Sequence, residues 1–237
     1  MDQNLLIQQL ADHKRTAWIP ETSETIPAFS DHSKFGGYPY LRNENDWPLC
    51  PNCNSHLQLI LQLNLTELPT QPDHRRPHLI QLFYCTNSED ECEITCEGWE
   101  AFSSVSCCRR INIQGPSIEI EANLLELFPE RRIVAWTERE DYPSIEEYEE
   151  LGLDPQTAYA GLPDEYYPIA VDKLCGWPSW EQSPEYPNDR QTGARMDLLF
   201  QLSSNRNIPW MWGDAGIGHL TQSPNDPNEL AFAWACA

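Results

Sequence analysis

Long apolar runs are missing from this sequence. No stretch approaches the roughly 20 apolar residues that a membrane-spanning helix needs, so we expect no association with a membrane interior. The short apolar stretch at Leu5–Leu10 has no basic segment before it and is too short for a signal peptide. These absences predict a cytoplasmic protein, in which cysteines are more often metal ligands than disulfide partners.

Basic residues are scarce. The chain has 15 lysines and arginines against 37 aspartates and glutamates, which gives a net charge of −22. Nucleic-acid binding depends on clustered lysine and arginine that neutralise phosphates, so this composition argues against nucleic acid as a partner. A strongly acidic surface promotes solubility and also suits a basic protein partner. The sequence leaves the oligomeric state open.

A catalytic signature is also missing. The glycine-rich run at residues 213–219 lacks the lysine of a phosphate-binding loop. No nucleophile is paired with His219, the histidine that ends this run. The sequence therefore favours a protein that is not an enzyme, without deciding the question.

Cysteine, by contrast, is abundant and clustered. Cys50 and Cys53 form a C-x2-C pair, and Cys85, Cys92 and Cys96 follow within one short stretch. This spacing is typical of a tetrahedral zinc site. We expect Cys50, Cys53 and Cys85 to be ligands, with either Cys92 or Cys96 as the fourth. Four thiolates leave no open coordination position, so the predicted Zn²⁺ is structural.

The hydrophobic pattern predicts mainly strands. Leucine alternates with polar residues over residues 56–65, which is the pattern of a half-buried strand. Further strands are expected at residues 78–85, 117–121, 132–137, 195–202 and 230–237, whereas residues 19–35 contain two prolines and are expected to form a loop or a short strand. Helices are expected at residues 2–14, after a capping box at Ser144 and Glu147, and after Asp154.

The chain also contains an internal similarity. The run Lys34–Pro39 recurs 139 positions later as Lys173–Pro178, and Leu59–Leu63 recurs at the same spacing as Leu198–Leu202. We interpret this as two β-rich repeats packed into one body, in an α+β fold that is predominantly antiparallel β. The predicted organisation is an N-terminal helix and lead-in (1–32), a first repeat with the zinc knuckle (33–137), an acidic helical connector (138–171) and a second repeat without zinc (172–237).

These motifs carry a family resemblance. Residues 17–20, 33–39, 61–63, 172–178, 213–220 and 232–236 resemble the YwqG-like family, a bacterial family of unknown function. The first half is also similar to the N-terminal part of programmed cell death protein 2, which implies a chaperone for basic ribosomal proteins. Some relatives of the bacterial family look like immunity proteins. The resemblance favours Cys85 and Cys92 as the second ligand pair. The family has glycine where Cys175 stands, so we expect a slightly altered turn there.

Two alternative functional surfaces follow from the remaining residues. The preferred one is a docking surface for a basic protein, formed by acidic residues of the connector and by tryptophans that could anchor an interface. Its candidate residues are Glu146, Glu147, Glu150, Trp177 and Trp180. The alternative is an enzyme or small-ligand site in a cleft between the repeats, with Trp212, Asp214 and His219 as its candidates.

Overall fold

The computed structural model describes residues 3–26, 29–70, 78–124, 126–158 and 161–237. These residues form one antiparallel sheet with the strand order β10-β9-β8-β7-β1-β6-β2-β3-β4-β5. The strands are β1 (Arg15–Ser23), β2 (Lys34–Phe35), β3 (Gln58–Asn64), β4 (His78–Tyr84), β5 (Ser106–Asn112), β6 (Arg131–Asp141), β7 (Lys173–Cys175), β8 (Asp197–Ser203), β9 (Ile217–Gln222) and β10 (Leu230–Ala235).

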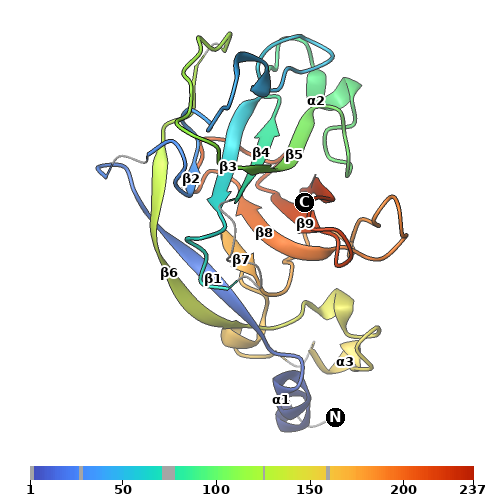
Figure 1. The fold of residues 1–237 in the computed structure, drawn as a ribbon. Coiled ribbons are helices and arrows are strands. Elements are labelled where there is room, and N and C mark those ends of the chain that lie inside the picture. Colours follow the sequence, from blue (N-terminus) through green and yellow to red (C-terminus); the bar gives the residue numbers. More distant parts are fainter. Residues whose placement is uncertain (1–2, 27–28, 71–77, 125, 159–160) are drawn as a thin grey trace.

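The sheet curls into a nearly closed barrel. Its two edge strands, β5 and β10, approach each other (Figure 1). Near this seam the Trp234 amide donates to the Trp99 carbonyl at 3.1 Å, and the Trp234 indole Nε1 donates to the Tyr84 hydroxyl at 3.0 Å. Hydrogen bonds therefore join the two ends of the sheet.

Helices contribute little to the described structure. They are α1 (Gln3–Ala11), α2 (Cys92–Thr95) and α3 (Pro155–Ala158), together with 3-10 turns at Glu44–Asp46, Ile145–Glu147 and Asp164–Tyr166. The predominantly antiparallel β character is confirmed, but the helices are too short to support the α+β label. No helix among the described residues has the length and apolar character needed to span a membrane.

Two long central strands carry two groups of shorter strands. β1 and β6 pair along their whole length, from Arg15 opposite Asp141 to Ser23 opposite Arg132. We call strands β2–β5, which continue from β6, the first arm, and strands β7–β10, which continue from β1, the second arm. Each arm adds its four strands in chain order, outward from the central pair.

A buried glutamine in each arm makes equivalent hydrogen bonds. Gln62 in β3 donates from Nε2 to the carbonyls of Ser30 and His32, at 2.8 and 2.9 Å. Its Oε1 accepts from the Tyr40 amide at 2.9 Å. In β8, Gln201 donates to the carbonyls at positions 169 and 171 and accepts from the amide at position 179. Each residue in this set lies 139 positions before its counterpart in the second arm.

The glycine turn after β2 also has a counterpart after β7. Gly36 has a φ of 58° and Cys175, 139 positions later, has a φ of 59°. The prediction of an altered turn is wrong for the backbone, because Cys175 adopts the same left-handed φ as Gly36. The two sites differ in space: a Cβ added at Gly36 would lie 2.4 Å from the Pro129 carbonyl oxygen.

Two sequence expectations for strands differ from the structure. Residues 15–23 form a full central strand, β1, although Pro20 lies within it. Proline has no amide hydrogen to donate, and the pairing of β1 with β7 covers only Ala17 and Trp18, before this proline. Conversely, residues 117–121 form no strand, and β5 is the neighbour of β4 instead.

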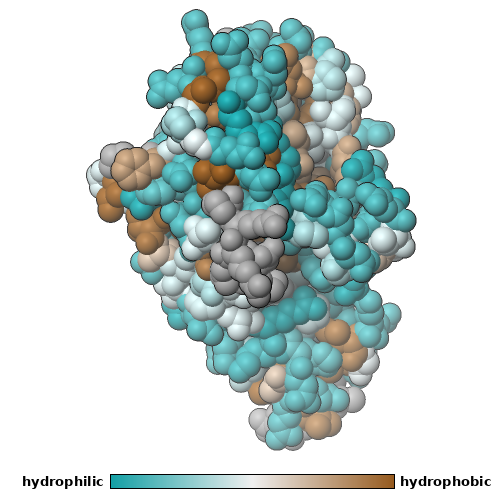
Figure 2. Space-filling model, viewed as in Figure 1, coloured by the Kyte–Doolittle hydropathy of each residue, from teal (hydrophilic) through white to brown (hydrophobic). Residues whose placement is uncertain are grey.

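The barrel interior is apolar and joins both arms. Phe35 of the first arm meets Phe200 of the second edge to face, with ring centroids 5.9 Å apart. Below the barrel, α1 buries Leu6 and Leu10 against Tyr148 in a second, smaller cluster. Most of the face shown in Figure 2 is hydrophilic, and hydrophobic residues lie in scattered patches.

Candidate metal centre

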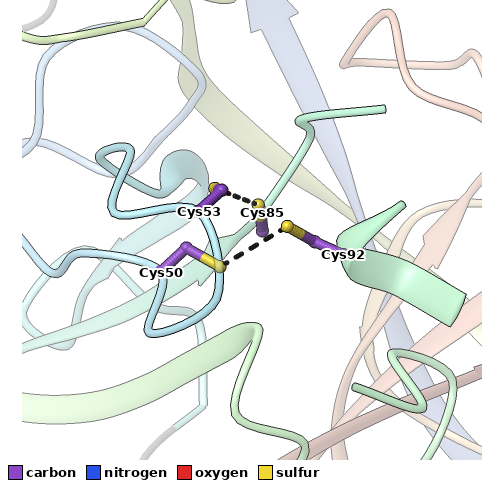
Figure 3. A group of neighbouring side chains, drawn as sticks. All are labelled: Cys50, Cys53, Cys85 and Cys92. Carbon is purple, nitrogen blue, oxygen red and sulfur yellow. Dashed lines mark hydrogen bonds between the residues drawn. The ribbon is translucent and has the colours of Figure 1, made fainter. Parts of the chain in front are cut away.

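A tight turn before β3 holds the C-x2-C pair. The turn is closed by a bridge between Leu49 and His56. Inside it, the Cys50 amide donates to the Ser55 carbonyl and the Asn54 amide donates to the Cys50 carbonyl, both at 2.8 Å. Asn54 adopts a left-handed φ of 58°, which asparagine tolerates better than most residues. This backbone places the Cys50 and Cys53 side chains on the same side of the turn (Figure 3).

The other two cysteines come from the chain that follows β4. Cys85 lies directly after that strand, and its amide donates to the Val105 carbonyl at 2.8 Å. Cys92 is the first residue of the short helix α2. Because β3 and β4 are antiparallel neighbours, the end of β4 lies beside the start of β3, where the turn is.

The four sulfur atoms form a compact group. The ligand atoms of Cys50, Cys53, Cys85 and Cys92 all lie within 4.8 Å of one another. The sulfurs of Cys50 and Cys92 are 3.8 Å apart, and those of Cys53 and Cys85 are 3.7 Å apart. A regular tetrahedron with Zn–S distances of about 2.3 Å has edges of about 3.8 Å. The group therefore fits a tetrahedral metal ion such as zinc, and Figure 3 shows the sulfurs facing a common centre.

The thiols differ in how readily they lose a proton. Burial raises the pKa of Cys92 to about 11 and that of Cys85 still further. For Cys53 burial acts in the same direction, but hydrogen bonds from Ser55 outweigh it and lower the pKa to about 6. A thiol must lose its proton to bind zinc, so metal binding here releases protons and weakens in acid.

One polar side chain supports this group from outside. Asn52, between the two cysteines of the turn, donates from Nδ2 to the Cys92 sulfur at 3.2 Å. A donor of this kind favours the thiolate and orients it. Cys96 is not in the group of four that lies within 4.8 Å; its amide caps α2 by donating to the Cys92 carbonyl.

The second arm has the same turn without cysteines. Asn188 and Arg195 form the bridge, the Asp189 amide donates to the Ala194 carbonyl, and the Gly193 amide donates to the Asp189 carbonyl. Asp189 occupies the position that corresponds to Cys50. Its Oδ1 accepts from the amides of residues 191 and 192, both at 2.8 Å, and its Oδ2 accepts from the Ser223 hydroxyl.

Hydrogen bonds to Asp189 thus close the second turn. The Ser223 hydroxyl, followed by the Thr192 amide, lowers the pKa of the Asp189 carboxyl to about 2. The carboxylate is therefore ionised at neutral pH. One turn converges on sulfurs that fit a metal, and the other converges on a carboxylate that needs none.

The residues predicted to dock a partner lie in different environments. Glu147 and Trp177 are buried. Glu147 accepts hydrogen bonds from the Trp180 indole at 2.8 Å and the Tyr186 hydroxyl at 2.7 Å. Glu150 is exposed and paired with Arg195 at 2.7 Å, and Glu146 is exposed. Glu147 and Trp177 hold the interior together and are not accessible to a partner.

The residues predicted to line a cleft differ in their exposure to solvent. Trp212 is fully buried and packs against Phe232, with ring centroids 4.9 Å apart. Asp214 is exposed. Burial, followed by the charge of Lys173, lowers the pKa of His219 to about 3. His219 is therefore neutral, and its Nε2 is 3.2 Å from the Ser179 carbonyl oxygen.

A groove of about 500 Å³ lies beside the cysteine group, and sequence reasoning did not identify it. It is lined by Cys85 and Glu89 on one side, by Glu126 and Phe128 on another, and by Trp210 from the second arm. These residues are separated by up to about half the chain, so their meeting depends on the closure of the barrel. No periodicity or motif in the sequence signals it.

Comparison with protein families identifies the region that contains this site. A family model described as a domain of unknown function (DUF1963) matches residues 33–236. No curated protein matches this sequence. The matched region begins just before β2 and includes both arms.

Proposed function

We propose that this chain, which belongs to the DUF1963 family of domains of unknown function, is a non-catalytic protein-binding module stabilised by one structural zinc ion. The observation that carries the metal part is the set of four mutually close sulfurs at tetrahedral spacing. Four thiolates complete the coordination of zinc and leave no position for a substrate or an activated water. The ion would fasten the turn before β3 to the chain after β4.

The metal part can be tested by measuring bound metal. Protein purified without added metal should contain one zinc per chain by atomic emission. A variant with Cys50→Ser and Cys85→Ser should contain far less. Stoichiometric iron, or no metal in freshly purified and reduced protein, would contradict the assignment.

The partner that we propose is a basic protein. The support is the net charge of −22, because a surface of this charge attracts positively charged proteins and disfavours nucleic acid. The resemblance to programmed cell death protein 2 favours a chaperone of a basic ribosomal protein. The similarity of some relatives of the YwqG-like family to immunity proteins favours neutralisation of a toxin. Both roles need binding and neither needs catalysis.

Affinity purification at low and high salt tests this proposal. Tagged protein should recover a basic partner at low ionic strength and lose most of it at high ionic strength, because salt screens exposed charges beyond about 10 Å at 0.1 M. If the protein keeps its recovered partner in solution, its role is that of a chaperone. If it blocks a toxic activity of the partner, its role is that of an immunity protein. Recovery of no protein, or only of acidic proteins, would refute the role.

We also infer that the two arms are copies of one unit. The equivalent hydrogen bonds of Gln62 and Gln201 support this. So do the matching turns at Cys50 and Asp189 and the shared spacing of 139 positions. On this interpretation the zinc site is specific to one copy.

A further inference from the structure

We propose that the groove beside the cysteine group binds an arginine side chain of a basic protein. This inference rests on the proposed function and gives it a contact point. The groove lies where four separate parts of the chain meet: residues 55–58 around the start of β3, the segment between Cys85 and Cys92, the segment before β6, and residues 209–210 of the second arm. Its volume of about 500 Å³ is ample for one long side chain and its neighbours.

The groove lies between two strongly acidic segments. Residues 86–105 contain six acidic residues and no lysine or arginine, and residues 116–130 contain four acidic residues and again no lysine or arginine. From these segments Glu89 and Glu126 line the groove, and both are exposed. Within the described part of the chain, no basic side chain pairs with either glutamate. Two unneutralised carboxylates favour a cation and repel a phosphate.

The remaining walls are mixed. Part is polar, with Ser55, His56, Gln58, Thr86, Asn87 and Asn123, and part is aromatic and apolar. Phe128 and Trp210 lie with ring centroids 6.3 Å apart and both line the groove, together with Leu124 and Pro209. A planar guanidinium can stack on aromatic rings while its N–H groups bind carboxylates. Its apolar stem can cover the remaining hydrophobic surface. Arginine therefore matches the combination of ring and carboxylate better than a compact, strongly hydrated lysine ammonium.

Trp210 offers one further group. Its indole Nε1 is buried and has no hydrogen-bond partner among the described residues. A buried donor without an acceptor is unfavourable. A bound peptide would supply an acceptor only if the indole turned to expose this nitrogen to a main-chain carbonyl, a group that a free guanidinium compound lacks.

The test uses the full chain with its metal and a labelled peptide that alternates arginine with alanine. Fluorescence anisotropy should show binding, and a peptide with citrulline in place of arginine should not bind, because citrulline keeps the shape and removes the charge. The variant with Glu89→Gln and Glu126→Gln should bind the arginine peptide about tenfold or more weakly. Both positions are exposed, so the fold should tolerate the change.

A matched control separates the groove from the overall charge. Glu138→Gln with Glu149→Gln removes the same charge at exposed positions outside the groove, and should weaken binding by about twofold or less. Equal losses in the two double variants, or no binding of the arginine peptide by the wild type, would overturn the groove proposal. In either case, recovery of a basic partner by affinity purification would leave the proposed function standing.

Discussion

The two arms contain the same tight turn, but different side chains lie inside it. Each must close a tight turn beside the end of a neighbouring strand. In the first arm, Cys50 and Cys53 turn toward two more thiols at distances that fit a metal. In the second, Asp189 accepts two amide hydrogen bonds and one from Ser223. The same turn backbone therefore occurs with two different sets of side chains: four thiols in the first arm, and a carboxylate with a serine in the second.

The two sets of side chains differ in what they depend on. If the four close thiols hold an ion as proposed, a chelator can remove it, and protons compete with the metal for the sulfurs. The carboxylate of Asp189 closes its turn without an ion, provided that it stays ionised and accepts its hydrogen bonds. The proposed metal would therefore belong to one arm, since the second arm closes the same kind of turn by hydrogen bonds alone.

Metal removal is expected to have the largest effect. Chelation, or Cys50→Ser, should destabilise the protein by more than about 4 kcal/mol, because the turn, the start of β3 and the end of β4 lose their common anchor. Circular dichroism during thermal unfolding, with and without a strong zinc chelator, measures this. Amide exchange should increase first in the first arm. Equal exchange in both arms would show that the ion supports the whole barrel.

The cysteine group illustrates what the sequence could predict. The C-x2-C spacing identifies Cys50 and Cys53 because both ligands lie in one local turn. The choice between Cys92 and Cys96 could not be made from spacing, because it depends on the start of α2. There Cys92 points toward the turn, and Cys96 caps the other end of the helix.

The acidic connector illustrates what the sequence could not predict. Four glutamates in the segment 146–150 suggest a solvated face, yet Glu147 is buried. Its partners, Trp180 and Tyr186, lie more than 30 residues further along the chain. Long-range partners leave no local pattern. Alternation did predict β3, although both of its faces are buried in the structure, whereas Pro20 concealed β1.

Gly36 and Cys175 share a left-handed φ at equivalent positions of the two arms but carry different side chains. Gly36→Ala should destabilise the protein by more than about 3 kcal/mol, since the new Cβ would lie 2.4 Å from a backbone oxygen and the φ of 58° is unfavourable for alanine. Cys175→Ala, at nearly the same φ, should cost about 1 kcal/mol, because a Cβ is already accommodated there. Urea unfolding of both variants provides the values. Similar losses of unfolding free energy in the two variants would mean that the left-handed φ, and not the space around the Cβ, determines the cost.

Asp172 and Ser33 occupy equivalent positions, 139 residues apart, and only the aspartate ionises. Each accepts a hydrogen bond from the backbone of the neighbouring strand, from Ser203 at 2.6 Å and from Asn64 at 2.9 Å. Burial raises the pKa of Asp172 to about 6. The folded state therefore binds the proton more tightly than the unfolded state, and this contribution to stability is lost as the pH rises from about 4 through 6.

The size of this effect follows from the same shift. Relative to Asp172→Asn, the wild type should lose up to about 3 kcal/mol of unfolding free energy between pH 4 and pH 7. The matched variant Ser33→Ala should differ from the wild type by an amount that does not change with pH, since serine does not ionise. Urea titrations across this range measure both differences. A pH-independent difference for Asp172→Asn would contradict the prediction.

The smallest expected effect concerns the turn of the second arm. Asp189→Ala removes the acceptor of two amides and one hydroxyl and should lower the melting temperature by about 5 °C. Asp189→Asn keeps an acceptor for the amides and should lower it less. Because this turn holds no metal ligand, the loss should be the same with and without chelator, whereas Cys50→Ser should cost little once the metal has been removed. If chelation instead enlarges the effect of Asp189→Ala, the two arms are energetically coupled through the central strands, and the metal stabilises both turns.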